Sequence, residues 1–316
     1  MTVRHTFAFS FVSISASAIF LALAGCATGQ RDVLPSGQAS NAQVLPTPNV
    51  AKPPPYSVER FSLPGPVAGV LVKIDLNDPR VRVAVALADD RDPDGDGPCV
   101  GQLDTTSQVA RKHDFDITIN ASFFTAPTPR ETAGQKIRYF IGNCAWPEGW
   151  HFSNGKVFGK PKTASLWATM IVHRDKTISL FDALDTLPAD TQFAVSGNAM
   201  MLKNGSPTPP AKDEARHPRS AVGLSADARK LFILAIDGRQ EMHSRGVTLG
   251  ELANIFIQFG AHNAINLDGG GSTSLVIKDP GSGSFAIANQ PSDSSTLKLP
   301  VRFERPVVDV VGIKIE

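Results

Sequence analysis

A strand, a helix and a second strand in succession constrain the fold of this chain more than any other feature. Residues 231–236 form an apolar run typical of a buried strand. Residues 249–259 carry apolar side chains at helical spacing, and Thr248 with Glu251 forms a capping box in front of them. Residues 264–267 again resemble a buried strand. This order predicts a parallel β-α-β crossover unit.

Each of the two strands is followed directly by an aspartate, Asp237 and Asp268. If the strands are parallel neighbours, both acids lie at the edge where open α/β sheets gather ligands. The second acid opens the string Asp268-Gly269-Gly270-Gly271-Ser272. Three successive glycines cost backbone entropy, which indicates a tight turn or a close approach to a ligand, and their amides can form an anion-binding concavity. A plain glycine-rich turn with a capping aspartate remains the alternative.

The rest of the chain is rich in strand patterns and poor in helices. Apolar or alternating runs predict strands at residues 67–75, 81–87, 117–120, 165–173, 177–181 and 193–201. Thr105 and Gln108 predict a capped helix that reaches about His113. We therefore expect an α/β mixed (α+β) fold, in which residues 67–316 form a single domain with mixed β-sheets and a few helices.

The N-terminus predicts export and lipidation. Arg4 precedes an apolar run at residues 7–23, and the string Leu23-Ala24-Gly25-Cys26 follows. We interpret residues 1–25 as a signal peptide, because the run is shorter than the roughly 20 residues of a membrane-spanning helix. The string resembles the bacterial lipobox, in which the cysteine, here Cys26, is lipidated. Ala27 favours sorting to the outer membrane, so we expect a lipid-anchored protein of the cell envelope.

A proline-rich segment and a balanced charge complete this description. Residues 27–66 contain eight prolines, and we predict that residues 26–66 are an extended linker. The chain of 316 residues has a formal net charge of +1. A neutral chain has no electrostatic footprint for nucleic acid, so we expect none as a partner. An anionic substrate would have to be held by local basic groups.

Two further patterns bear on disulfides and metals. Cys99 and Cys144 remain after Cys26, and an even pair in an exported chain indicates a disulfide, with two unpaired thiols as the alternative. Residues 92–97 resemble the first half of a calcium loop, but Leu103 occupies the twelfth position, which needs an acid. We interpret them as an exposed acidic turn. The sequence calls for no cofactor and leaves a divalent metal open.

A basic cluster precedes one of the core strands. Arg219 can bind phosphate oxygens through its forked guanidinium, and His217 titrates near neutrality. A solvated loop with salt bridges is the alternative for this cluster. Asn120 at a strand end and Arg239 after Asp237 are, taken alone, common turn residues.

The order of these motifs is more specific than any one of them. The chain contains, in sequence, Asn120-Ala-Ser-Phe-Phe124, Ser196-Gly197-Asn198, Arg219-Ser-Ala-Val-Gly223, Asp237-Gly-Arg239, Ser244-x-Gly246-x-Thr248, Asn266-Leu-Asp-Gly-Gly-Gly-Ser272, Asn289-Gln-Pro-Ser-Asp293 and Glu304-Arg-Pro-Val-Val-Asp309. Together they resemble the phosphodiester glycosidase family over roughly residues 67–316. Ala121 and Ser122 depart from the resemblance, because the family commonly has glycines after the asparagine.

The resemblance implies a hydrolase that releases a sugar, N-acetylglucosamine-like, from a sugar-phosphodiester of cell-envelope or exopolysaccharide glycans. It makes Asp268 and Asp237 the candidate catalytic carboxylates. It implies a substrate-binding role for the residues Asn120, Arg219, His217, Arg239, Ser244, Gly269, Gly270, Gly271 and Ser272. Two alternatives stay open, a non-catalytic glycan-binding lipoprotein of the envelope and a structural envelope protein in which the glycines only shape turns.

The lipidation hypothesis predicts the behaviour of one variant. Cys26→Ser removes the thiol that would carry the lipid, so the protein should become soluble or remain unprocessed. Membrane fractionation and the intact mass measure this. A variant that still fractionates fully with lipid, at the parent mass, would contradict the hypothesis.

Overall fold

A computed structural model of the chain describes residues 52–88, 99–127, 130–132, 135–153, 155–159, 167–208, 215–293 and 303–316. Cys26, the predicted signal peptide and the acidic turn at residues 92–97 lie outside these ranges. The unit built by these ranges runs from Lys52 to Glu316. Within it, no helix is long and apolar enough to cross a bilayer.

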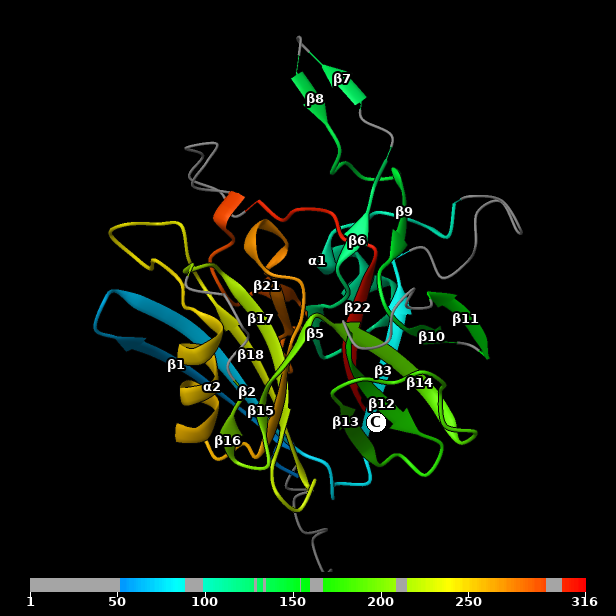
Figure 1. The fold of residues 1–316 in the computed structure, drawn as a ribbon, viewed down its shortest axis with the longest axis vertical. Helices are drawn as coiled ribbons and strands as arrows, with labels where there is room; N and C mark the ends of the chain where they lie inside the picture. Colours follow the sequence, from blue (N-terminus) through cyan, green and yellow to red (C-terminus); the bar gives the residue numbers. More distant parts are fainter. Residues whose placement is uncertain are drawn as a thin grey trace, which may run out of the picture. The chain divides into compact units, whose positions relative to one another are not determined.

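The largest sheet has seven strands, and the glycine-rich turn follows the end of one of its interior strands. In spatial order its strands are β1 (Tyr56–Leu63), β2 (Val67–Asp75), β18 (Lys230–Ile236), β17 (Arg219–Leu224), β19 (Asn263–Asn266), β15 (Ala199–Lys203) and β16 (Ser206–Pro207). Every pairing between them is antiparallel. Figure 1 shows this sheet beside helix α2 (Leu249–Gln258).

Helix α2 packs its apolar side against this sheet. Its fully buried Leu252 and Phe256 join the same cluster as Phe232 of β18. A side chain of this size stabilises the fold by about 1.5–3 kcal/mol when buried. Gly223 makes the approach possible, since a Cβ there would lie 2.8 Å from the Phe256 ring. The predicted capping box is confirmed, because Thr248 and Glu251 exchange both of its hydrogen bonds.

Two five-stranded sheets form the other half of the unit. One contains β11 (Lys156–Gly159), β10 (His151–Ser153), β14 (Thr191–Gly197), β12 (Ala168–His173) and β13 (Ile178–Phe181). The other contains β21 (Phe285–Ile287), β20 (Leu275–Lys278), β5 (Ile117–Asn120), β22 (Asp309–Ile315) and β3 (Val81–Leu87). The predicted helix before His113 is α1 (Thr106–His113), capped by the Thr105 hydroxyl, and it packs against the second of these sheets.

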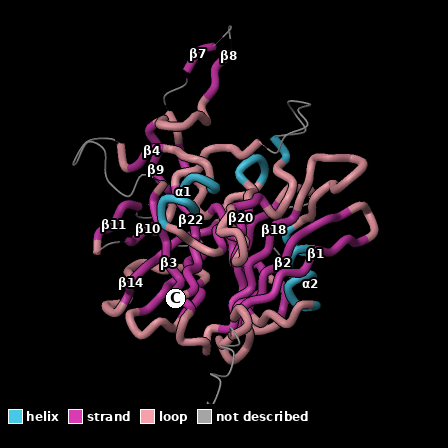
Figure 2. The backbone as a smooth tube through the Cα atoms, turned by 180° about the vertical axis from the view of Figure 1, so that it is seen from behind, coloured by secondary structure: helices cyan, strands magenta, loops and turns pink. Residues whose placement is uncertain are grey.

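One apolar cluster joins the three sheets. It combines Ile233 of the seven-stranded sheet with Met170 of the β12 sheet and with Ile119 and Val311 of the β5 sheet, all of them fully buried. Figures 1 and 2 show the seven-stranded sheet and the two smaller sheets as opposite halves of this unit. The sheets therefore pack face to face around a common core, as in layered β architectures.

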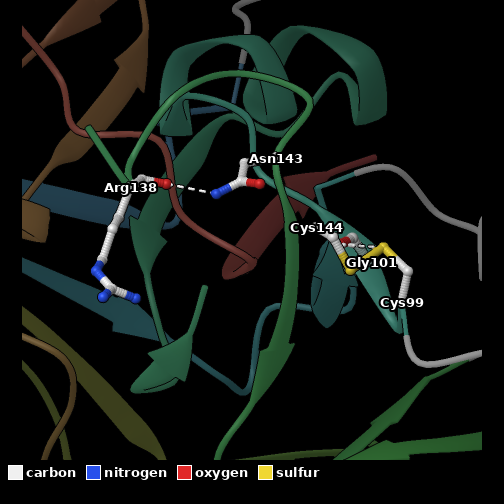
Figure 3. The surroundings of a disulfide bond; sticks show 5 residues. All are labelled: Cys99, Gly101, Arg138, Asn143 and Cys144. Atoms are coloured by element: carbon white, nitrogen blue, oxygen red, sulfur yellow. Dashed lines mark hydrogen bonds between the residues drawn. A yellow bond between two sulfur atoms is a disulfide. The ribbon is translucent and has the colours of Figure 1, made fainter. Parts of the chain in front are cut away.

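A small three-stranded sheet extends from the ends of these layers. Its strands are β4 (Gly101–Gln102), β9 (Cys144–Pro147) and β6 (Phe124–Thr125), and the ribbon of β7 (Arg130–Thr132) and β8 (Gln135–Ile137) lies beyond it. Cys99 and Cys144 form a disulfide with their Cα atoms 5.4 Å apart, which confirms the predicted pairing. Figure 3 shows this bond beside the Asn143 amide, which donates to the Arg138 carbonyl at 2.6 Å.

The predicted fold class is correct only in part. The unit is mostly β-sheet with two short α-helices, and every strand pair in the described residues is antiparallel, so the prediction of mixed sheets is wrong. The predicted strands of the β-α-β unit, β18 and β19, do run in the same direction. They are not neighbours, however, because β17 pairs with both and lies between them.

Two predicted boundaries also differ from the structure. Residues 193–201 were expected to form one strand, but the chain leaves β14 at Gly197 and enters another sheet as β15. A Cβ at Gly197 would lie 1.9 Å from the Asn266 carbonyl oxygen, so the change of sheet needs a glycine. The predicted linker at 26–66 includes β1, an edge strand with mostly exposed side chains and therefore no clear apolar pattern.

The disulfide predicts a defined loss of stability. Replacing both Cys99 and Cys144 by serine should lower the free energy of unfolding by about 2–4 kcal/mol, because the bond restricts the unfolded chain. Chemical denaturation measures the change, and the reduced parent protein should match the double variant. Two free thiols in the mass spectrum of non-reduced protein from an oxidising compartment would contradict the pairing.

Candidate active site

The glycine-rich turn after β19 is built by close backbone contacts. The Asp268 amide donates to the Ala121 carbonyl at 2.8 Å, and the Gly270 amide donates to the Pro218 carbonyl at 2.9 Å. Gly270 has a φ of +62°, and a Cβ at Gly269 would lie 2.6 Å from the Pro218 carbonyl oxygen. Each glycine therefore serves a steric requirement of the turn. A short 3-10 helix, η2 (Gly270–Ser272), completes it.

A pocket of about 250 Å³ opens beside this turn. It is lined by Phe123, Asn198, His217, Pro218, Arg219, Arg239, Asp268, Gly269, Gly270, Gly271 and Arg305. The lining combines three arginines, one histidine and a single carboxylate. Such a lining suits an anionic ligand, because guanidinium groups bind phosphate and carboxylate oxygens through paired hydrogen bonds.

Asp268 is the only carboxylate that lines the pocket, and its surroundings favour the neutral acid. Burial away from water raises the pKa of the Asp268 carboxyl to about 7. The Asp309 carboxylate adds to this rise by like-charge repulsion. Ser272, Arg305 and the Gly269 amide act in the opposite direction, because they favour the charged form. At neutral pH the group is therefore close to half ionised, as a general acid or base requires.

Two arginines lie directly over the glycines. The Arg239 guanidinium lies 3.0 Å from the position that a Gly270 Cβ would occupy, and Arg239 itself has a φ of +58°, a strained backbone for a long side chain. The Arg305 guanidinium is even closer to Gly271, where a Cβ would meet its Nη2 at 2.1 Å. Any side chain at these glycines would displace the cations from the turn.

Arg305 is held in place from two sides. Its Nε lies 3.2 Å from Asp293 Oδ2 and its Nη2 lies 3.3 Å from Asp293 Oδ1, a two-point ion pair. Its guanidinium also stacks over the Tyr139 ring, 4.4 Å from the ring centroid. Such contacts fix the guanidinium plane before a ligand arrives.

The basic cluster predicted from the sequence does reach the pocket. Arg219 is 6% exposed, and it donates from Nε to the Val247 carbonyl at 3.1 Å and from Nη2 to the Ala215 carbonyl at 3.2 Å. His217 places Nδ1 3.5 Å from Arg239 Nη2. Arg219 is therefore anchored in the pocket wall, and Arg239 offers its guanidinium to solvent more freely.

Asp237 lies outside the pocket lining, although it shares the sheet edge with Asp268. Its carboxylate is 5% exposed and lies 2.8 Å from His243 Nε2. It also accepts hydrogen bonds from the Gln290 amide at 2.7 Å and from Asn289 Nδ2 at 3.2 Å. These partners occupy both carboxylate oxygens. The structure gives Asp237 the surroundings of a group that orders the neighbouring loops.

Ser244 and Asn120 are likewise bonded inside the fold. The Ser244 hydroxyl donates to the Asp237 carbonyl at 2.6 Å and accepts from the Ala68 amide at 3.1 Å. Asn120 Nδ2 donates to the Asp268 carbonyl at 2.7 Å. Its Oδ1 accepts from the Ser220 hydroxyl at 2.6 Å. Both are buried, and neither is among the residues that line the pocket.

Some lining residues were not among the sequence-based candidates. Arg305 and Asn198 occur in quoted motifs, but no role was assigned to them. Phe123, which follows Asn120 by three residues, pairs with the Trp167 ring at 6.2 Å. Within the described ranges, no cluster of three or more His, Cys, Asp or Glu residues could hold a metal ion. Ser272, a predicted substrate-binding residue, is buried next to the turn, where it favours the charged form of Asp268.

Comparison with known proteins defines the class of this molecule. Residues 113–314 match the family profile described as phosphodiester glycosidase. The matched range covers more than half of the chain and includes every pocket residue. The chain therefore belongs to the phosphodiester glycosidase family, as the motif order indicated.

Individual relatives are more distant. The chain is 39% identical over 75 residues to the N-acetylglucosamine-1-phosphodiester alpha-N-acetylglucosaminidase of Bos taurus, which is 24% of this chain and 12% of that protein. It is 38% identical over 63 residues to the SPbeta prophage-derived protein YomE of Bacillus subtilis (strain 168), which is 20% of this chain and 10% of that protein. The alignments thus span only about a tenth of the length of these relatives.

A solved structure shares the fold over most of the chain. The catalytic domain of the zebrafish N-acetylglucosamine-1-phosphodiester alpha-N-acetylglucosaminidase superposes with a TM-score of 0.59. The match covers 84% of this chain and 85% of that domain, at 21% identity. At this identity the likeness establishes the common fold.

The raised pKa of Asp268 predicts a pH-dependent stability. The unfolded carboxyl titrates near pH 4 and the folded one at about 7, so the folded state binds more protons between these values. Stability is therefore lost as the pH rises from about 4 to 7. Asp268→Asn cannot ionise, and its melting temperature relative to the parent should rise over this range and level off above it. Thermal unfolding at pH 4–8 measures this, and a difference independent of pH would contradict it.

Proposed function

We propose that this protein is a hydrolase that releases a sugar from a sugar-1-phosphodiester. The observation that carries the proposal is the pocket lining, in which one carboxyl with a pKa of about 7 lies among three arginines and a glycine turn. A sugar-1-phosphodiester has an anomeric carbon for the carboxylate and an anionic phosphate for the arginines. Family membership supports this substrate class.

In the proposed reaction, Asp268 acts at the anomeric centre. Its ionised form accepts a proton from a water molecule while the water oxygen bonds to the anomeric carbon. The bond between that carbon and the phosphate oxygen breaks, and its electron pair leaves with the phosphate. A carboxyl with a pKa near the working pH is an effective base, and a positioned group of this kind contributes about 100- to 10,000-fold to the rate.

The arginines receive the charge that develops on the leaving phosphate. Arg219 was the phosphate ligand proposed from the sequence, and the structure adds Arg239 and Arg305, whose guanidinium groups lie over Gly270 and Gly271. Fixed cations stabilise such charge more than solvent does, because they need no reorganisation when the charge develops. Because phosphate is already a good leaving group, one carboxylate suffices where many glycosidases use two.

The sugar and the location are also proposals. The name of the bovine relative, an N-acetylglucosaminidase that acts on a phosphodiester, supports an N-acetylglucosamine-like sugar. The Leu23-Ala24-Gly25-Cys26 string supports a lipid anchor at the outer membrane, with a substrate in cell-envelope or exopolysaccharide glycans. A lipid-anchored enzyme would meet its glycan substrates at the membrane surface.

The proposal predicts turnover by the purified soluble domain. Incubation with a panel of sugar-1-phosphodiesters should release free sugar. Asp268→Asn conserves volume and removes the charge, so turnover should fall at least about 100-fold. Arg219→Lys keeps the charge and loses the fork, so it should raise the KM for phosphodiesters in particular.

A matched control separates this effect from a general loss of charge. Asp185 is an exposed aspartate between β13 and β14, remote from the pocket lining, and Asp185→Asn should leave turnover unchanged. Near-normal turnover in folded Asp268→Asn would remove Asp268 from the mechanism. A parent protein that binds the panel and releases no sugar would instead indicate a glycan-binding module.

A further inference from the structure

A buried histidine–aspartate hydrogen bond is not explained by the chemistry above. His151 Nδ1 lies 2.6 Å from Asp309 Oδ2, and both side chains are completely buried. His151 Nε2 lies 3.1 Å from the Ser153 hydroxyl, so both ring nitrogens have a partner. The pair joins β10 of one sheet to β22 of another, and neither residue lines the pocket. Burying these polar groups is costly, so their hydrogen bonds must offset the cost.

Asp309 also accepts hydrogen bonds from the turn that follows β5. Its Oδ1 accepts from the Ser122 amide at 2.7 Å and its Oδ2 accepts from the Ser122 hydroxyl at 2.7 Å. Its backbone carbonyl accepts from the Ala121 amide at 3.2 Å. One residue thus fixes two successive residues of the turn by three hydrogen bonds, two of them to a carboxylate and therefore strong.

This turn reaches the pocket at two points. The Ala121 carbonyl accepts the Asp268 amide at 2.8 Å, so the position of Ala121 sets the position of the Asp268 backbone. The next residue after Ser122 is Phe123, whose side chain lines the pocket. A displacement of the turn would therefore move both Asp268 and a pocket wall.

We propose that Asp309, oriented by His151, is a positioning residue that holds Asp268 in the pocket through Ser122 and Ala121. The inference rests on the function proposed above for Asp268. It assigns Asp309 no contact with substrate. A misplacement of about 1 Å at a reacting group can cost about 100-fold in rate, so such a support affects catalysis strongly.

The charges around Asp268 make the role of Asp309 measurable. Arg305, Arg219, Arg239 and His217 share the pocket with Asp268, and Asp309 is the nearby carboxylate that raises its pKa. His151 is the titratable group that faces Asp309 itself. Removing the Asp309 charge should thus lower the pKa of Asp268, whereas removing only a hydrogen bond to Asp309 should not.

Two variants test the proposal. Asp309→Asn keeps the shape and removes the charge, so kcat should fall about 10- to 100-fold. The acidic limb of the kcat–pH profile should move to lower pH. Ser122→Ala removes one hydrogen bond and leaves the Asp309 charge, so kcat should fall while the acidic limb stays where it is. In both variants kcat should fall by a larger factor than the KM rises, because neither residue touches substrate and only Phe123 of the pocket wall adjoins the turn.

Direct titration of Asp268 keeps this test independent of the proposed activity. The ¹³C carboxyl resonance of Asp268, assigned by its absence in Asp268→Asn, should titrate at lower pH in Asp309→Asn than in the parent. An unchanged Asp268 titration and kcat in folded Asp309→Asn would overturn the positioning role, as would full activity in Ser122→Ala. If Asp309→Asn does not fold, the Ser122→Ala result decides. A shifted titration in a protein that releases no sugar would refute the activity alone.

Discussion

The buried amide of Asn120 is the interaction on which the pocket depends. It lies at the end of β5 and is bonded to the Asp268 carbonyl, the Ser220 hydroxyl and the Ser274 amide. Ser220 belongs to β17 of the seven-stranded sheet, whereas β5 belongs to another. The amide has both a donor and an acceptor, so it can tie together a carbonyl, a hydroxyl and an amide where a hydrophobic residue would leave all three unsatisfied. The two halves of the core and the glycine-rich turn therefore meet at one side chain.

The groups around Asp268 act in opposite directions on its pKa. Burial and a second carboxylate push Asp268 toward its neutral form, and Arg305, Ser272 and the Gly269 amide favour its charged form. Burial prevails, and the pKa of the carboxyl rises to about 7. Proteins commonly give up stability to hold a carboxyl pKa near neutrality at a functional site. A fully solvated aspartate has a low pKa and would be a weak base. Two of the pocket arginines also have partners of their own, Asp293 and Tyr139 for Arg305 and backbone carbonyls for Arg219.

Local signals in the sequence predicted local structure well. The Thr248 and Glu251 cap, the helix after it and the strands at residues 67–75, 81–87 and 117–120 all follow from spacing and capping chemistry. The place of Asp268 beside a glycine turn was also predictable. The hydrogen bonds of the Asp237 carboxylate were not predictable, because only the folded loops bring His243 and Gln290 near it.

Long-range arrangement accounts for the remaining differences. A strand–helix–strand pattern cannot reveal that β17 is inserted between β18 and β19, because that pairing involves residues before the pattern begins. For the same reason the sequence predicted no role for Arg305, because its motif lies more than 30 residues after the glycine turn. Ser122 departs from the glycines of the family resemblance, and the structure supplies its reason in the Asp309 carboxylate.

The position of β22 has a consequence for how this molecule is made. β22 follows the other described strands in the sequence, yet it lies in the interior of its sheet, paired with β5 on one side and β3 on the other. These two strands are formed from residues almost 200 or more positions earlier. Until β22 pairs with them, β5 and β3 each have an unpaired edge, and the Ser122 turn lacks its hydrogen bonds to Asp309. While residues 309–315 are still inside a ribosome or a translocation channel, the rest of the chain therefore cannot complete the β5 sheet or fix the Ser122 turn, so this half of the core closes only after they emerge.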